Sequence, residues 1–362
     1  MPAPKSFDDR LAAYKQAIDD DIASYAAFAQ ESARARYDKY ATLEVDAFLD
    51  ILARGGKRIR GALVMLGYEM CGGKDQAMIV QAARALEMLH AYMLILDDIQ
   101  DRAAVRRGKP AAHKMLEEYH RKHHLKGDGE HTGLSLAINV AAAGNHAAQI
   151  VLANLNADPQ LKLNALSITN RTLMITSHGQ SCDIMNEIVE DPEPADLDNV
   201  MEWKTALYSF INPLHVGMVL AGAGCQDTDA ITPYALHVGK GFQIADDLLG
   251  LFGDEKELGK SPMDDMREGK MTVLMAHAIK NSPAKDVTFL RKMLGNQDLT
   301  AAEFTRCQEI VKASGAVEYA QERAAQEVDV ALRELDTVAH RWPAADVQFL
   351  RELAKKMTQR RK

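Results

Sequence analysis

The sequence predicts an all-α protein: a single large helical bundle around a central cavity, formed by one domain over residues 1–362. Residues that favour helices are abundant, and aromatic residues make up only 6% of the chain. No segment shows the sustained period-two alternation of a strand bounded by hairpin turns. Between turn signals the chain runs for about 20 residues, which is long enough for helices of about 30 Å in a large bundle.

Short stretches rich in Gly, Pro, Asn and Asp should separate these helices. They are CGGKD (71–75), KGDGEHTG (126–133), NLNADPQ (154–160), EDPEPAD (190–196) and FGDEKELGKSPMDD (252–265). None has the length or low complexity of a domain linker, so we expect each helix to begin and end near them.

The charge balance limits the classes of partner. The chain has 43 basic and 51 acidic residues and a formal net charge of −8. That argues against general nucleic-acid binding, which needs a basic surface, although local basic clusters can still bind small anions. The most apolar window, residues 134–155, contains Asn139, Asn145, His146 and Gln149. We therefore expect a buried helix there and no stable membrane insertion.

The cysteines and the N-terminus favour a cytoplasmic protein. Cys71, Cys182, Cys225 and Cys307 are far apart and form no CxxC motif, so we interpret them as reduced thiols. The first residues lack the basic-then-apolar layout of a signal peptide.

Three aspartates end an apolar stretch in LHAYMLILDDIQD. If residues 82–101 are helical, Asp97 and Asp101 share a face and Asp98 lies on its flank. An acidic helix end exposed to water is the common interpretation. However, two carboxylates about 4 Å apart repel by roughly 4 kcal/mol at an effective dielectric near 20, so a partly buried cluster favours a cation. Mg²⁺ prefers oxygen ligands and usually binds one or two carboxylates together with a substrate phosphate.

A second acidic pair occurs in GKGFQIADDLLGLFGDEKELGK. Asp246 and Asp247 are adjacent, and Gln243 lies one helical turn earlier. Two such clusters on separate apolar helices can face each other across a cavity and hold several metal ions. Lys260 and Lys270 follow, either as ordinary surface lysines or as part of a cage for a diphosphate.

Basic residues supply sites for a second anion. Lys57 and Arg60 should share a face at the start of an apolar helix, where free N–H groups favour anions. Arg106 and Arg107 follow the first acids, and a guanidinium suits phosphate oxygens. By contrast, four histidines in a polar stretch indicate a solvated surface: His120, His123, His124 and His131.

Seven motifs in order resemble those of the trans-isoprenyl diphosphate synthases, the farnesyl/geranylgeranyl or polyprenyl synthetase family. They are GGKRIRG, EMLHAYMLILDDIQD, RRGKPAAH, HGQSCD, KTA, GFQIADD and GKSPMDDMREGKMT, between residues 54 and 273. The resemblance implies an all-α prenyltransferase fold of isoprenoid synthase type I, three Mg²⁺ ions with Mn²⁺ as a substitute, and a homodimer.

The same resemblance assigns roles by position. The metal-binding residues would be Asp97, Asp98, Asp101, Asp246 and Asp247, with Asp246 the key ligand of the second motif. The allylic diphosphate would be held by Arg106, Lys204, Lys260 and Lys270. Isopentenyl diphosphate would be held by Lys57, Arg60, His90 and Arg107. The reacting carbons would face Lys204, Thr205 and Gln243, and Asp183 would support that site. The implied reaction is ionisation of the allylic diphosphate followed by condensation.

Some positions depart from the family pattern. Gly250 stands where the second acidic motif ends in aspartate, and Asp254 lies one turn further on. Leu96 replaces a frequent His, Gly61 a usual Pro, and Asn145 the Asp of a Gly-Asp pair. A weak or non-catalytic regulatory subunit therefore stays an alternative. A class I terpene cyclase is another, although it would not need GGKRIRG or a second acidic pair after Phe-Gln.

Product length should depend on bulky residues before the first acids. Met93 and Tyr92 lie four and five positions earlier, the latter about 7.5 Å along the helix axis. An aromatic floor predicts a twenty-carbon product, with the fifteen-carbon product of a farnesyl diphosphate synthase as the alternative; Tyr92 as ordinary core is also open. The basic tail, residues 359–362, is interpreted as solvated, or alternatively as a cover over the diphosphate end.

Overall fold

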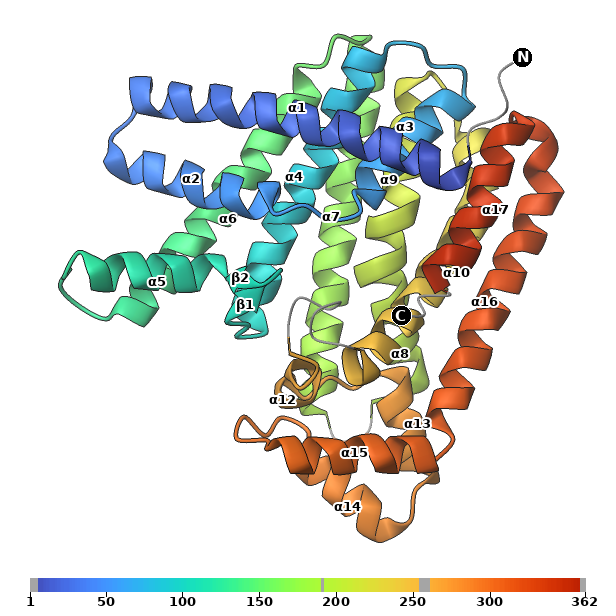
Figure 1. Ribbon diagram of the computed structural model, residues 1–362. Helices are drawn as coiled ribbons and strands as arrows, with labels where there is room; N and C mark the ends of the chain where they lie inside the picture. The colour runs from blue at the N-terminus through green and yellow to red at the C-terminus, as the bar shows by residue number, and fades with distance from the viewer. Residues whose placement is uncertain (1–5, 190–191, 254–260, 359–362) are drawn as a thin grey trace. The chain divides into compact units, whose positions relative to one another are not determined.

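The computed structural model describes residues 6–189, 192–253 and 261–358, and these residues are almost entirely helical (Figure 1). Within them, the only strands form one short hairpin of β1 (Val105–Arg106) and β2 (Lys109–Pro110). The predicted all-α class is confirmed. The chain divides into two compact units. The first comprises residues 1–168 and 213–223, and the second comprises residues 169–212 and 224–362. The prediction of a single domain stays a prediction.

The first unit is built around one long helix. Its elements are α1 (Phe7–Arg36), α2 (Lys39–Ala53), α3 (Ile59–Met70), α4 (Gln76–Gln100), α5 (Ala112–Lys122), α6 (Gly129–Ala153), the start of α7 (Pro159–Ile188) and most of α9 (Asn212–Leu220). Helix α4 packs against α1, α2, α3, α5 and α6. Its inner face buries Ile79, Leu86, Leu89 and Ile95 completely, which fixes the acidic end of the helix.

Polar side chains begin these helices where the turn signals predicted. Asp75 accepts a hydrogen bond from the backbone N–H of Met78 and so caps α4. Asp128 caps α6 in the same way, through the N–H groups of Glu130 and His131. Each cap satisfies donors that have no partner inside the helix.

Within the described residues, two helices, α4 and α6, are long and apolar enough to cross a membrane by length and composition alone. This is weak evidence, because the core helices of soluble proteins pass the same test. In α4, 61% of the relevant window is buried inside the unit; in α6 the share is 33%. Helix α6 therefore keeps an exposed apolar face, which includes Ile138 and Ile150.

The second unit is built around α10 (Cys225–Phe252), which packs against α16 and α17 (Figure 1) and also against η1. The other elements are α8 (Pro194–Asn199), η1 (Val200–Ile211), α12 (Asp264–Glu268), α13 (Val273–Asn281), α14 (Ala284–Met293), α15 (Ala301–Ala313), α16 (Ala316–Val338), η2 (Ala339–Arg341) and α17 (Ala344–Thr358), with the rest of α7. A shared apolar core includes Ile244, Leu251, Met266 and Leu274. Element η1 is a π-helix, a form that is rare and often found at functional sites.

Candidate active site

The first acidic cluster lies at the C-terminal end of α4. Asp98 is completely buried, and Arg106 donates from Nε to its Oδ1 at 2.7 Å. Arg106 also donates to Oδ2 of Asp97 at 3.2 Å, and Asp101 forms the C-cap of the helix. Burial raises the pKa of Asp98 to about 6; Arg106 opposes this rise, and Asp97 and Asp101 add to it. The second oxygen of Asp98 is buried without a hydrogen-bond partner in the described part of the chain.

The hairpin that follows α4 places the arginines. Arg107 and Gly108 form its two-residue turn, and both have positive φ angles, 55° and 72°, as type I′ turns require. Arg54 holds the hairpin from the end of α2. Its guanidinium donates to the carbonyl oxygens of Arg106 at 3.0 Å and Pro110 at 2.8 Å. The hairpin backbone therefore directs Arg106 onto the acids, and Arg54 at the end of α2 holds that backbone in place.

The charges of four arginines act on His90 of α4. Burial lowers the pKa of His90 well below its ordinary value, and the charges of Arg60, Arg107, Arg106 and Arg58 lower it further. The imidazole is therefore neutral at physiological pH. Such a concentration of guanidinium groups around a neutral donor or acceptor is suited to a diphosphate.

The basic residues near α3 do not lie as the sequence predicted. The helix begins at Ile59, after Arg58 in a left-handed conformation. Lys57 therefore precedes the helix and is exposed, so its expected pairing with Arg60 on one helical face is wrong. Arg58 is buried instead, and donates to Asp19 at 2.8 Å and Glu87 at 3.3 Å. It is a structural residue of the first unit.

In the second unit, Asp183 binds two predicted site lysines. Its Oδ2 accepts from Lys204 Nζ at 2.7 Å and from Lys270 Nζ at 3.2 Å. Lys270 also lies 3.0 Å from Oε1 of Glu187. Burial would raise the pKa of Asp183, but Lys204 and Lys270 outweigh it and hold that pKa below its ordinary value. The carboxylate thus stays charged and keeps both ammonium groups together.

A second polar chain connects the π-helix with α10. The hydroxyl of Thr205 donates to Oε1 of Gln243, and Nε2 of Gln243 donates to Oδ1 of Asp247 at 2.7 Å. Burial raises the pKa of Asp247 well above its ordinary value; the hydrogen bond from Gln243 opposes this, and nearby carboxylates, Asp246 first, add to it. Asp246 itself is exposed. Hydrogen bonds at both its oxygen and its nitrogen therefore fix the orientation of the Gln243 side-chain amide.

Comparison with known proteins decides the family. The model of the family described as polyprenyl synthetase matches residues 43–311. The chain belongs to the polyprenyl synthetase family. A geranylgeranyl diphosphate synthase of Saccharolobus solfataricus is 31% identical, over 89% of this chain and 92% of the relative. A geranylfarnesyl diphosphate synthase of Aeropyrum pernix is 31% identical, over 83% and 88%.

A solved structure agrees with this assignment. The geranylgeranyl pyrophosphate synthase of Corynebacterium glutamicum, complexed with isoprenyl diphosphate and magnesium, is 30% identical and superposes with a TM-score of 0.88. The similarity covers 96% of this chain and 99% of that one. As a member of the polyprenyl synthetase family, the chain is a prenyltransferase.

The carboxylates of this polyprenyl synthetase fit Mg²⁺ shared with a phosphate. Among the described residues, no three His, Cys, Asp or Glu side chains form a group that could hold a metal ion. Asp98 nevertheless has a buried oxygen without a hydrogen bond, and Asp247 experiences the charges of neighbouring carboxylates. Mg²⁺ usually keeps several waters and needs only one or two protein carboxylates when substrate phosphates complete its shell.

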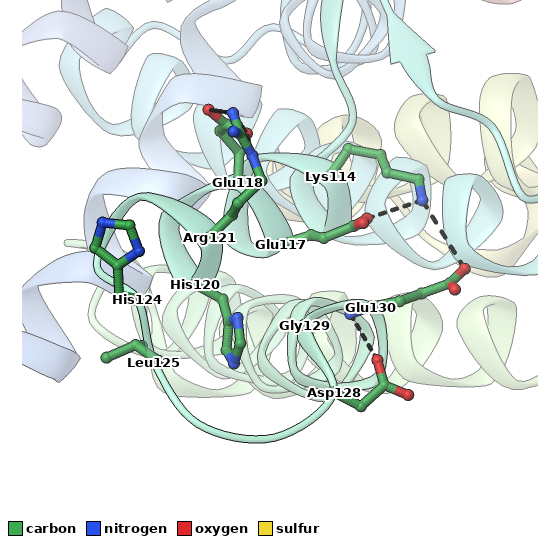
Figure 2. A pocket seen from close by; sticks show the side chains of 10 residues that line it. All are labelled: Lys114, Glu117, Glu118, His120, Arg121, His124, Leu125, Asp128, Gly129 and Glu130. Carbon is green, nitrogen blue, oxygen red and sulfur yellow. Dashed lines mark hydrogen bonds and ion pairs between the residues drawn. The ribbon is translucent and has the colours of Figure 1, made fainter.

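The pocket in Figure 2 is separate from these residues. It has a volume of about 660 Å³ and lies between α5 and the start of α6. Its lysine, Lys114, is 2.9 Å from Glu117 and 3.9 Å from Glu130, so the positive charge of this lysine is already paired. The pocket corrects one prediction: His120 is buried, and its Nε2 lies 3.1 Å from the carbonyl oxygen of Lys126. The three other histidines of that stretch are exposed as predicted.

Of the remaining predicted positions, some are described by the structure and others lie outside the described residues. Tyr92 and Met93 are partly buried on α4, one turn or more before the acids. Lys260, Asp254 and the tail at 359–362 lie outside the described residues. Sequence reasoning missed Arg54, whose side chain is almost fully buried under the hairpin. Its position beside GGKRIRG was the available signal.

Proposed function

We propose that this prenyltransferase condenses isopentenyl diphosphate with an allylic diphosphate (dimethylallyl, geranyl or farnesyl) and makes geranylgeranyl diphosphate. The observation that carries the proposal is that α4 passes through two regions of opposite charge, one acidic and one basic. Buried Asp98 and partly buried Asp97 lie at its end beside Arg106, and neutral His90 lies two turns earlier, where the charges of arginines act on it. One region suits a metal-bound diphosphate, and the other suits a diphosphate bound directly. The geranylgeranyl diphosphate synthases among the relatives support the twenty-carbon product.

The reaction breaks the bond between C1 of the allylic group and its diphosphate. The double bond of isopentenyl diphosphate then attacks C1, and a new carbon–carbon bond forms. A proton leaves the condensed product, and the released pyrophosphate accepts it. We assign Arg106, Lys204, Lys260 and Lys270 to the departing diphosphate, whose developing charge they stabilise.

The other assigned residues hold and orient the second substrate. Lys57, Arg60, His90 and Arg107 would bind the diphosphate of isopentenyl diphosphate. Thr205 and Gln243 present oriented oxygens that would stabilise positive charge on carbon, because the chain to Asp247 fixes the amide. Water must be kept from the cation, which it would quench.

Asp97, Asp98, Asp101, Asp246 and Asp247 would hold Mg²⁺, with Mn²⁺ as a substitute. When bound, the metal neutralises charge on the leaving diphosphate. Three ions are proposed by resemblance to the family.

We propose that a residue on α4, Tyr92, sets the length of the product. Tyr92 lies about 7.5 Å before Asp97 along the helix axis, and would form the floor against which the growing chain stops. The fifteen-carbon product is the alternative, and the geranylfarnesyl relative makes longer products a further outcome of the test.

We also propose a homodimer formed by the exposed face of α6. Ile138 is 50% exposed and Ile150 is 60% exposed, and after Glu130 the helix contains no Asp, Glu, Lys or Arg. A long apolar helical face without charge favours a second copy of itself. Sedimentation of Ile150→Glu should show monomers, whereas Phe28→Glu, at another exposed apolar position, should not change the association state. A dimeric Ile150→Glu protein would contradict this interface.

The deciding experiment is incubation of the purified protein with Mg²⁺, isopentenyl diphosphate and each allylic diphosphate, followed by product analysis. We expect geranylgeranyl diphosphate as the main product and no turnover with EDTA. A terpene cyclase would instead consume the allylic diphosphate alone. A regulatory subunit would give no product without a partner. Arg60→Ala should raise the Michaelis constant for isopentenyl diphosphate, because it removes one of the guanidinium groups around His90.

A further inference from the structure

Helix α1 packs against α3 and α4, and it lies before the part of the chain that matches the family. Its Ile18 and Ile22 are buried. A Cβ atom placed on Gly61 of α3 would lie 2.7 Å from Cδ1 of Ile18, which is closer than real Cβ contacts. Glycine, at a position where the family usually has proline, therefore allows α1 to approach the start of α3.

Arg58 joins α1 to the loop over residues 54–58, between α2 and α3. Its Nε donates to Oδ1 of Asp19 on α1 at 2.8 Å, and its Nη1 donates to Oε2 of Glu87 on α4 at 3.3 Å. Its Nη2 donates to the carbonyl oxygen of Leu52 on α2 at 2.9 Å. The side chain is buried, and its φ of 52° is uncommon for a residue other than glycine. Partners on three helices therefore fix this residue.

The carboxylate of Glu87 holds both ends of the segment from Arg58 to Gly61. Its Oε1 accepts a hydrogen bond from the backbone N–H of Gly61 at 2.9 Å, while its other oxygen accepts from Arg58. Glu87 is buried, and a buried carboxylate needs such partners. Proline at position 61 could not donate this bond. Arg60 lies between the two residues that are held.

The same loop carries or contacts three groups assigned to isopentenyl diphosphate. Lys57 immediately precedes Arg58, and Arg60 follows it by two positions. The guanidinium of Arg107 donates to the carbonyl oxygen of Gly55. Asp19 and Glu87 pair the charge of Arg58, so Arg58 serves to hold the loop. A displacement of Arg58 would therefore move the loop and the groups that bind the second substrate.

We propose that Asp19 of α1 is a positioning residue for the isopentenyl diphosphate site. It holds Arg58, and Arg58 holds the loop that carries Lys57 and leads into Arg60. Asp19 acts through Arg58 and needs no contact with the substrate. This inference rests on the proposed function, because it gives α1 a part in binding the second substrate of that reaction.

Three variants test this role. Asp19→Ala removes the acceptor; the side chain of Asp19 is 29% exposed and Arg58 keeps Glu87, so we expect this variant to fold. Asp19→Asn keeps an oxygen that can accept the hydrogen bond. Asp21→Ala is the matched control, because Asp21 on the same helix pairs with Arg84 of α4, outside the loop. Thermal melts measure how far each change weakens the docking of α1.

The readouts are calorimetric binding of isopentenyl diphosphate with Mg²⁺ but without an allylic substrate, and steady-state kinetics with both substrates. In Asp19→Ala we expect the Kd and the Michaelis constant for isopentenyl diphosphate to rise by about tenfold, because small misplacements of positioning groups are costly. The Michaelis constant for the allylic diphosphate should not change. Asp19→Asn should have a smaller effect, and Asp21→Ala should change neither constant even where it lowers the melting temperature.

Two results overturn the inference: unchanged binding and kinetics in Asp19→Ala, or an equal rise in Asp21→Ala, which would show a general loosening of α1. The proposed function fails separately. If the protein makes no prenyl product but binds isopentenyl diphosphate in a way that depends on Asp19, the function fails and the positioning role stands. If it makes product and Asp19→Ala has no effect, only the positioning role fails. A protein that neither binds isopentenyl diphosphate nor makes product refutes both.

Discussion

Replacement of Asp98 by asparagine should make the metal-free protein more stable at neutral pH and abolish Mg²⁺-dependent activity. The side chain is fully buried, and burial raises its pKa from 3.8 to about 6. The folded state therefore binds this proton more tightly than the unfolded chain. Stability falls as the pH rises from the unfolded pKa through the folded one. The shift corresponds to about 3 kcal/mol above the folded pKa. Asparagine avoids this penalty and can still accept the hydrogen bond from Arg106.

The assay is urea unfolding in EDTA at a series of pH values from about 4 to 8. The free energy of unfolding of Asp98→Asn should increasingly exceed that of the unchanged protein as the pH rises through 6, reaching the order of 3 kcal/mol. Asp229→Asn, an exposed position on α10, serves as the control for the charge change. A difference that does not depend on pH would refute the reasoning, and so would an Asp98→Asn protein that is less stable at pH 8. Retained activity would refute the metal role.

Three further outcomes are expected. Asp183→Ala should raise the Michaelis constant for the allylic diphosphate more than that for isopentenyl diphosphate, because Lys204 and Lys270 lose their shared carboxylate; equal effects in steady-state kinetics would argue against positioning. Tyr92→Ala should lengthen the product seen by chromatography, and an unchanged distribution would remove Tyr92 as the floor. Deletion of residues 359–362 should raise the Michaelis constant for isopentenyl diphosphate if the tail covers that end; unchanged kinetics would refute the cover.

The sequence was informative where the determinants are local. Turn residues predicted both ends of α6 and the C-terminal ends of α3 and α4 closely, because capping and apolar spacing act within one or two turns. The repulsion within Asp97, Asp98 and Asp101 also follows from adjacent positions. It predicts a cation beside these acids; the metal ion stays a prediction, and the described structure places Arg106 against Asp97 and Asp98.

The sequence was uninformative where the determinants are tertiary. The burial of His120 depends on the start of α6, where Gly129 allows the backbone to approach the ring. The left-handed Arg58 depends on its partners Asp19 and Glu87, which come from α1 and α4. The approach of Asp265 to Gly250 brings α12 against α10, and no local pattern in the sequence predicts that contact.

Helix α4 runs without interruption from Gln76 to Gln100. Tyr92 and the acids at its end thus belong to one continuous helix, which sets their separation along its axis. With Tyr92 as the proposed floor, we expect single substitutions along α4 to alter the depth available to a growing prenyl chain one turn at a time, without changing the acids at its end. In a family built on such a helix, point mutations on that helix would then be enough to change the product, and the rest of the fold could stay the same.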